Sequence, residues 1–172
     1  MATTIARKGY GQVEPNHLSG IVTGQIYAQL PAATESSGTL TAIAQLEQGQ
    51  FLKYDYAKGC ADYAGTGEWL LVYCEEKLYD ERHQAHKDFV LKKTDFTDGY
   101  IYPRLIKTNV GDIYTTNMFG AANTALDATV GTSVSLSVGN FLQPADATGI
   151  LTLAASSGTP ISDPSSLTGM VW

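Results

Sequence analysis

The amino-acid sequence predicts a mainly β fold, a compact β-barrel or β-sandwich with an extended N-terminal arm and at most one short helix. Three observations support this prediction. Short apolar segments recur about every 8–12 residues with turn residues between them, a spacing typical of small barrels and sandwiches. Ser133–Val138 alternates strictly between polar and apolar residues, as in a half-buried strand. Only Leu78–Lys93 is a charged stretch free of glycine, so at most one short helix is expected.

Residues 1–48 differ in composition from the rest and are expected to form the extended arm. They are rich in Gly, Ala, Thr, Ser and Gln, and glycines and prolines interrupt every stretch long enough for a helix. Two interpretations remain open: the arm crosses a neighbouring subunit, or it packs on its own domain. Its apolar side chains are the candidate protein-interaction residues: Ile21, Val22, Ile26, Tyr27 and Leu30.

Residues 49–172 are expected to form one β-rich domain, and its first half contains the clearest strand signals. Gln50–Tyr56 alternates and is aromatic, which suits a strand. Gly59–Gly67 is rich in turn residues, and the apolar run Glu68–Tyr73 suits a buried strand. Leu78–Lys93 is expected to be a short helix or a solvated loop. Phe96–Gly99 then supplies a turn signal.

The second half continues as short strands and turns. Tyr100–Thr108 is predicted to be a strand, at an edge or with a bulge because it contains a proline. Further strands are expected at Val110–Asn117, Ser133–Val138 and Gly149–Ala154, followed by a loop rich in Pro, Ser and Gly. The pattern Val-Gly-(Asp or Asn)-apolar occurs twice, at residues 110–113 and 138–141. In small barrels such a turn often leads into the next strand.

The charge distribution argues against nucleic acid as a partner. The net charge is −6, and nucleic-acid binding relies on Lys and Arg to neutralise phosphates. Nine of the eleven Lys and Arg residues lie in residues 51–110, together with ten of the seventeen Asp and Glu residues. Residues 111–172 contain four Asp and no basic residue. A basic C-terminal tail is therefore excluded.

Neither a membrane segment nor a disulfide framework is expected. No apolar run approaches the roughly 20 residues of a transmembrane helix, and the first residues lack the apolar core of a signal peptide. Synthesis in the cytoplasm without secretion is expected. Cys60 and Cys74 are too few for a disulfide framework, and we expect them to be reduced and partly buried.

The sequence also lacks the familiar signatures of catalysis. It has no phosphate-binding glycine loop and no GxSxG nucleophile elbow. His83 and His86 have HxxH spacing, but they lie in a charge-dense segment that is expected to be solvated, so no metal and no cofactor is expected. A hydrolase that uses Glu75, Glu76 or Asp80 with one of these histidines is kept as an alternative hypothesis. We expect the protein not to be an enzyme.

Tyrosine is the most abundant aromatic residue, and eight of the ten tyrosines lie between residues 54 and 114. Most are expected to form ordinary cross-strand aromatic pairs. Tyrosine also offers contact area together with a hydroxyl group, so exposed tyrosines can bind sugars or proteins. A carbohydrate-binding or host-adhesion module that uses Tyr63, Tyr79 or Tyr102 is the second alternative.

Phrases in the middle of the chain carry a resemblance to a known family. The chain resembles the head decoration, or cement, proteins of tailed bacteriophages over roughly residues 50–140. The similar phrases are FLKY at 51–54, GEWLLVYCEEKLYD at 67–80, KDF at 87–89, Pro103-Arg104, and TNVGDIYTTN at 108–117. No catalytic signature is part of the likeness.

The resemblance implies a β-rich virion structural protein on the capsid surface. Such a protein binds the major capsid protein, bridges neighbouring capsomers from outside, and often clusters as a homo-oligomer, commonly a trimer, at local threefold axes. It stabilises the shell against the pressure of the packaged DNA. A tail-tube or head–tail connector subunit is an alternative of similar size and composition.

Overall fold

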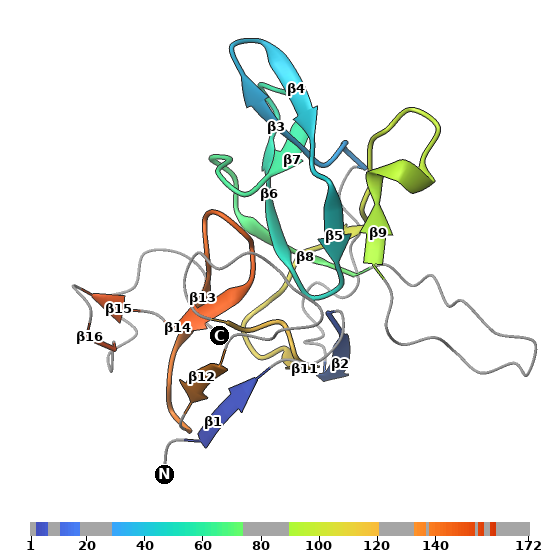
Figure 1. Ribbon diagram of the computed structural model, residues 1–172. Helices are drawn as coiled ribbons and strands as arrows, with labels where there is room; N and C mark the ends of the chain where they lie inside the picture. The colour runs from blue at the N-terminus through green and yellow to red at the C-terminus, as the bar shows by residue number, and fades with distance from the viewer. Residues whose placement is uncertain are drawn as a thin grey trace, which may run out of the picture.

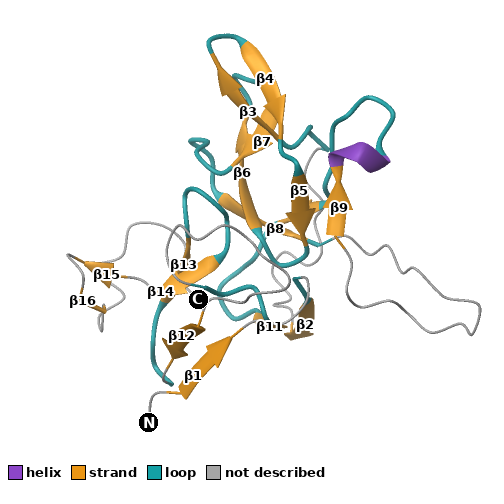
Figure 2. Cartoon of the chain, viewed as in Figure 1, coloured by secondary structure: helices purple, strands orange, loops and turns teal. Residues whose placement is uncertain are grey.

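The computed structural model describes residues 3–6, 11–17, 29–73, 90–120, 133–136, 138–153, 155–156 and 159–160. The prediction of a mainly β fold is confirmed (Figures 1 and 2). Within these ranges every strand pair is antiparallel, and the helical structure is one 3₁₀ turn at Lys93–Asp95. The sheets that can be described do not close into a barrel.

The centre of the fold is a four-stranded antiparallel sheet in the order β10-β8-β6-β7. These strands are β6 (Phe51–Asp55), β7 (Cys60–Asp62), β8 (Trp69–Val72) and β10 (Leu105–Ile106). All four residues of β8 are buried, as expected for a short apolar run covered on both faces.

Two hydrophobic clusters cover the two faces of this sheet. Because side chains alternate along a strand, β6 and β8 send neighbouring residues to opposite clusters. The first cluster includes Leu52, Tyr54, Leu70, Val72 and Leu105, with Leu46, Leu91 and Ile101 from surrounding segments. The second cluster is formed by Val13, Phe51, Trp69, Leu71, Ile106 and Leu151.

A β-hairpin of β3 (Ala33–Ser36) and β4 (Thr39–Ala42) projects from one end of the molecule (Figure 1). Its turn residues Ser37 and Gly38 both have positive φ angles, 53° and 82°. Two positive φ angles in a two-residue loop match the turn type whose twist suits a hairpin. At the base of the hairpin, the Ala32 N–H donates to the Ile101 carbonyl at 2.8 Å.

Residues 29–48, which the sequence assigns to the arm, pair and pack with the rest of the described fold. β5 (Gln45–Glu47) pairs with β9 (Val90–Lys92), and Leu46 of β5 is fully buried. Leu30 is half-buried and packs against the first cluster. The other four candidate interaction residues, Ile21, Val22, Ile26 and Tyr27, lie outside the described residues.

Two-stranded ribbons lie at the end of the molecule opposite the β3–β4 hairpin (Figure 1). β2 (Val13–His17) pairs with β11 (Ile113–Thr116), with an irregularity between Ile113 and Tyr114. β13 (Leu142–Pro144) pairs with β14 (Leu151–Leu153). The remaining pairs are β1 (Thr3–Ala6) with β12 (Ser133–Leu136), and β15 (Ala155–Ser156) with β16 (Thr159–Pro160).

Most strands expected in the second domain are present, with two differences. β6, β8, β11, β12 and β14 lie inside the segments predicted to contain them. Tyr100–Thr108 was predicted to be one strand, but only β10 at its end is extended in a ladder. The turn-rich segment Gly59–Gly67 contains β7, which the sequence did not predict. Leu78–Lys93 lies outside the described residues up to position 89, and its end forms β9.

Candidate protein-docking face

An apolar pocket of about 390 Å³ lies between the central sheet and the ribbons. Its walls come from six different strands and from the turns next to them. They include Val13 of β2, Phe51 of β6, Leu71 of β8, Tyr114 of β11 and Leu142 of β13, with Gly49 before β6. Ligand pockets are typically concave and mostly apolar, with a few polar groups. Four members of the second hydrophobic cluster therefore line this pocket: Val13, Phe51, Leu71 and Leu151.

The two copies of the Val-Gly pattern lie beside this pocket. Val110 and Val138 have exposed fractions of 99% and 107%, so neither side chain is covered by the rest of the chain. Each is followed by a glycine with a positive φ angle, 96° at Gly111 and 91° at Gly139. Such a φ angle is readily adopted only by glycine. The glycine thus fixes a turn that leaves the preceding valine at its tip.

The residue after each of these glycines lines the pocket. Asp112 follows the first turn and Asn140 follows the second, and both contribute to the pocket wall. Ile113 also lines the pocket and is 56% exposed. The sequence pattern that looked like a repeated turn is therefore a pair of turns, distant in sequence, that converge on one concave apolar site.

The first of these turns is held by the carboxylate of Asp112. One oxygen of Asp112 accepts hydrogen bonds from the Asn109 N–H at 2.8 Å and from the Tyr114 hydroxyl at 3.1 Å. Burial raises the pKa of Tyr114, and the hydrogen bond to Asp112 raises it further, so the phenol keeps its proton. The turn is consequently fixed at both its start and its end.

Acidic residues lie on the strands and turns that form this site, and the basic residue Lys53 on β6 is paired with Asp146 at 3.2 Å. Glu14 lies on β2 and is exposed, and Asp112 lies in the first turn. Residues 111–172, which provide most of the pocket, contain no Lys or Arg. We call Val110, Ile113, Val138 and the pocket between them the docking face. It combines apolar surface with negative charge.

A buried polar network supports the docking face from behind. Gln50 is fully buried, and its side-chain oxygen accepts from the Glu47 N–H at 2.5 Å. Its amide nitrogen donates to the Thr148 carbonyl at 2.8 Å and to the Tyr63 hydroxyl at 3.3 Å. The fully buried Glu47 carboxylate accepts from the Gly11 N–H. These bonds join four segments of the chain, at Gly11, at Glu47 and Gln50, at Tyr63 and at Thr148.

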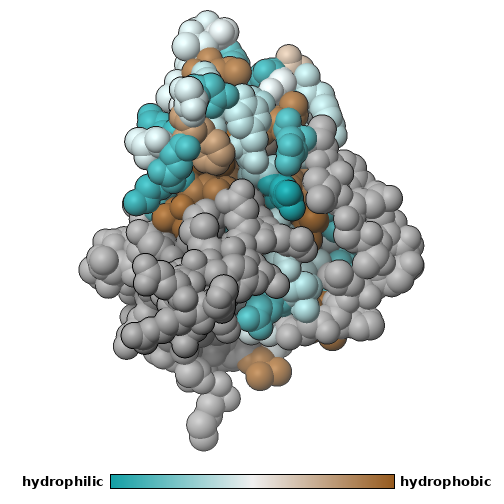
Figure 3. Space-filling model, turned by 90° about the vertical axis from the view of Figure 1, so that its right-hand side faces the viewer, coloured by the Kyte–Doolittle hydropathy of each residue, from teal (hydrophilic) through white to brown (hydrophobic). Residues whose placement is uncertain are grey.

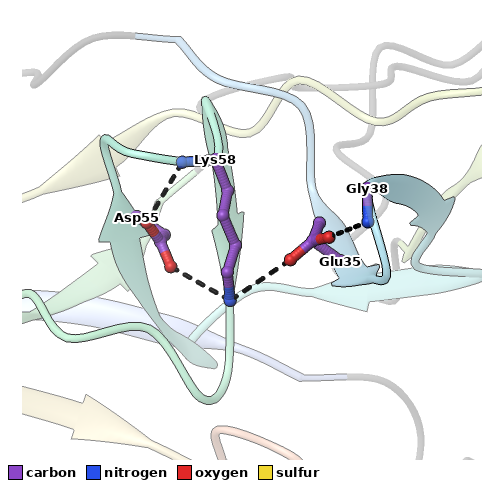
Figure 4. Close-up of polar contacts among 4 residues, drawn as sticks. All are labelled: Glu35, Gly38, Asp55 and Lys58. Carbon is purple, nitrogen blue, oxygen red and sulfur yellow. Dashed lines mark hydrogen bonds and ion pairs between the residues drawn. The ribbon is translucent and has the colours of Figure 1, made fainter.

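A second polar cluster fixes the β3–β4 hairpin to the central sheet (Figure 4). The Lys58 ammonium lies 3.2 Å from an Asp55 oxygen and 3.8 Å from a Glu35 oxygen. Glu35 in turn accepts from the Gly38 N–H in the hairpin turn. Burial alone would raise the pKa of Asp55, but the hydrogen bonds and charge of Lys58 outweigh it and hold that pKa below its ordinary value.

Of the three tyrosines singled out in the sequence, the structure describes Tyr63 and Tyr102. Tyr63 is half-buried, and burial raises its pKa to about 12. Tyr102 is 40% exposed, but its hydroxyl donates to Asp98 at 2.8 Å. Tyr79 lies outside the described residues. Tyr56, at 70%, is more exposed than either, which sequence reasoning did not identify.

The residues of the hydrolase hypothesis cannot be placed. Glu75, Glu76, Asp80, His83 and His86 lie outside the described residues, as does Cys74. Cys60 is a free thiol that is fully buried, and burial raises its pKa. Among the residues that are described, no three His, Cys, Asp or Glu side chains gather as metal ligands, and no helix is long and apolar enough to cross a membrane.

Comparisons with known proteins add no assignment. Neither family models, nor curated proteins, nor solved structures gave a match to this chain. The docking face is therefore interpreted from its own residues: exposed aliphatic side chains, an apolar pocket and an acidic flank. Such a surface suits contact with another protein, since contiguous exposed apolar surface commonly marks an interaction site.

Proposed function

We propose that this chain is a virion structural protein that binds the outside of a phage capsid and stabilises it by bridging neighbouring capsomers. The observation that supports a binding role is the docking face, where two fully exposed valines flank an apolar pocket. The likeness of residues 50–140 to phage head decoration proteins supplies the capsid as the partner. The docking face is the surface of this chain that binds the capsid in the proposal.

The energetics favour a repeated contact. Burying a fully exposed valine or isoleucine contributes about 1.5–3 kcal/mol, so the three aliphatic side chains of the docking face offer several kcal/mol per subunit. Association offsets part of this gain through lost freedom of motion. Many copies on a symmetric shell, or a homotrimer that engages three capsomers at once, convert a modest contact into firm attachment.

The charge of the face indicates the chemistry of the capsid surface that it fits. Asp112 lines the pocket, Glu14 lies on β2 next to the lining residue Val13, and the C-terminal third of the chain lacks basic residues. Complementary potentials across an interface favour correct partners and disfavour like-charged ones. The capsid protein is therefore expected to present apolar side chains beside Lys or Arg. Two copies of this face would repel each other, so homo-oligomer contacts are expected elsewhere.

A capsid-binding assay tests the proposal. Purified protein is mixed with phage heads that lack it, bound protein is measured by co-sedimentation, and the particles are imaged. We expect saturable binding and regular knobs on the head exterior. A Val110→Asp, Val138→Asp double variant should bind at least about tenfold more weakly, because it loses two aliphatic side chains that become buried against the capsid. Thr39→Asp, at the exposed hairpin, is the matched control.

The outcomes separate the alternatives. Both valines are fully exposed, so the double variant should keep the thermal stability of the wild type. Wild-type affinity in the double variant would show that the docking face is wrong while leaving capsid binding intact. Wild-type protein that binds tails or connectors instead of heads would overturn the decoration proposal.

A further inference from the structure

A second concave site lies on the central sheet, built from other residues than the docking face. It is a pocket of about 280 Å³ lined by Tyr54 and Tyr56, by Gly67 and Glu68 before β8, and by Leu70. Small-molecule pockets commonly have volumes of about 300–1,000 Å³, so this one suits a ligand of a single small ring.

Tyr56 gives this pocket an exposed aromatic wall. Its side chain is 70% exposed, whereas Tyr54 beside it is only 3% exposed. The two ring centroids are 5.5 Å apart and the rings are tilted by 42°. Burial raises the pKa of Tyr54 to about 12, with Tyr56 adding to the rise, so the Tyr54 ring stays a neutral phenol at neutral pH. The Tyr54 ring is anchored in the core, whereas the Tyr56 ring is exposed and can pack on a ligand.

An ion pair supplies the polar side of the pocket. The Lys107 ammonium lies 3.1 Å and 3.0 Å from the two oxygens of the Glu68 carboxylate. The side chains of Glu68 and Lys107 are 50% and 34% exposed, so both reach solvent at the rim. A carboxylate has about four acceptor sites, so Glu68 can accept further hydrogen bonds beside those from Lys107. The Glu68 carboxylate therefore presents exposed acceptors to the pocket.

Gly67 keeps the floor of the pocket close to β6. A Cβ atom at this position would lie 2.6 Å from the Tyr54 carbonyl oxygen, so any side chain here would push the backbone segments apart. The glycine lets the segment that carries Glu68 pass directly against the strand that carries the tyrosines. The aromatic and charged walls are thereby held next to each other.

We propose that this pocket binds one sugar residue of a neutral polysaccharide or glycan. A pyranose ring has an apolar C–H face that packs on an aromatic ring, and neighbouring hydroxyls that both donate and accept hydrogen bonds. Tyr56 provides the ring, and the exposed Glu68 carboxylate accepts hydrogen bonds from the hydroxyls of the sugar. The assignment is independent of the docking face, and a capsid-bound copy carries both sites.

The same pocket is a poor match for a quaternary ammonium ligand. Recognition of such cations uses several open aromatic faces and uncompensated negative charge. Here one of the two rings is buried, and the Glu68 carboxylate is neutralised by Lys107. A neutral polyhydroxylated ligand needs only the acceptors of Glu68, whereas a cation would be repelled by the Lys107 ammonium beside it.

Binding of the full chain to an array of immobilised glycans and bacterial polysaccharides is the test, followed by titration calorimetry with the bound sugar. We expect wild-type binding that falls at least about tenfold in Tyr56→Ala, since stacking area is lost. Glu68→Gln should weaken binding as well, because it loses the charged acceptor. Tyr102→Ala, another partly exposed tyrosine, is the matched control and should bind as the wild type does.

Each result decides the proposal. No glycan bound by the wild type, or equal binding by wild type and Tyr56→Ala, overturns it. Binding to immobilised phosphocholine in place of sugars overturns it in favour of a cation site. Thermal unfolding confirms that the exposed variants remain folded. Tyr56→Ala should keep full affinity for capsids, so a failure here leaves the capsid proposal untouched, and the reverse also holds.

Discussion

At the scale of single residues, Gln50 connects more of the structure than its polar side chain suggests. The side chain is fully buried at the start of the central sheet, and its amide reaches the Glu47 N–H, the Thr148 carbonyl and the Tyr63 hydroxyl. A buried polar group is costly unless it is hydrogen-bonded, and here the bonds are made on both ends of the amide. The docking face depends on this contact, because Gly49 next to it lines the pocket.

Replacing Gln50 by leucine should therefore destabilise the protein although leucine has a similar size. We expect the free energy of unfolding to fall by about 1–3 kcal/mol, since buried partners of the amide lose their hydrogen bonds. Urea denaturation measures the change. Thr39→Ala, on the exposed hairpin, should change stability by less than about 0.5 kcal/mol. A Gln50→Leu variant as stable as the wild type would contradict a structural role for the amide.

A second feature at the scale of single residues is the effect of Lys58 on how the stability of the protein depends on acid. Its ammonium holds the pKa of Asp55 below the ordinary value, despite the opposing effect of burial. A carboxyl group with a lowered folded-state pKa adds stability above its unfolded pKa of about 3.9 and loses it as the pH falls through the folded value. The contribution of Asp55 should thus be present at neutral pH and disappear in acid.

Lys58→Met should raise the pKa of Asp55, because burial then acts without the opposing ammonium. NMR titration of the carboxyl carbon measures that pKa directly. The loss of stability between about pH 5 and pH 2 should also be less steep than in the wild type. Lys92→Met removes an exposed lysine on β9 and serves as the control. An unchanged Asp55 pKa in Lys58→Met would refute the assignment.

At the scale of elements, the turn before β14 packs directly onto the central sheet. Gly149 has a φ angle of +66°, and its carbonyl accepts from the Phe51 N–H at 2.8 Å. A Cβ atom at Gly149 would lie 2.1 Å from the Phe51 carbonyl oxygen. Gly59 has nearly the same φ angle, +67°, but open space where its Cβ would be. A comparison of Gly59 with Gly149 therefore separates the cost of a left-handed backbone from the cost of a steric clash.

Alanine at these two positions should have unequal effects. Gly59→Ala should lower the free energy of unfolding by about 1–2 kcal/mol, the cost of a left-handed conformation for a residue with a Cβ atom. Gly149→Ala should lose about 1–3 kcal/mol more, because the new methyl group collides with the backbone of β6. Denaturation midpoints of the two variants give the comparison. Equal losses would mean that the contact with Phe51 is not close in solution.

Strands with a local apolar signal were predictable from the sequence, whereas a strand that depends on its pairing partner was not. β6 and β8 were predictable because apolar and aromatic residues in short runs are a local signal. β4, with sequence Thr-Leu-Thr-Ala, lacks a clear apolar stripe and is a strand because β3 pairs with it. The Ser37-Gly38 dipeptide was the local signal that would have located this hairpin.

The candidate sites were less predictable than the strands. The repeated Val-Gly pattern was visible in the sequence, but its convergence on one pocket depends on packing between β11 and β13, which are about thirty residues apart. Nothing local distinguishes the exposed ring of Tyr56 from the buried ring of Tyr54, two residues earlier. Long-range packing decides both, so sequence reasoning chose other tyrosines.

At the scale of the whole molecule, the central sheet joins two hydrophobic clusters. Leu70 packs in the first cluster, whereas Trp69, its neighbour on β8, packs in the second. Loss of packing on one face should therefore be felt on the other through the shared strand. The described body should unfold as one cooperative unit, as small domains usually do.

Leu70→Ala tests this coupling. The cavity should lower the free energy of unfolding by about 2–5 kcal/mol. In a Trp172→Phe background Trp69 is the remaining tryptophan, so its fluorescence reports the second cluster. Fluorescence and far-ultraviolet circular dichroism should give coincident transitions at the lower midpoint. Two separate transitions would show that the clusters unfold independently.

The position of the β3–β4 hairpin has a practical consequence. It lies at the end of the molecule opposite β11 and β13, and the upper end of the molecule is mostly hydrophilic to neutral in Figure 3. Its turn at Ser37 and Gly38 is exposed, with open space around the added Cβ position at Gly38. A copy attached through the docking face holds this turn outward. A foreign epitope inserted between Ser37 and Gly38 would then be displayed in a dense, regular array, as a particulate vaccine requires.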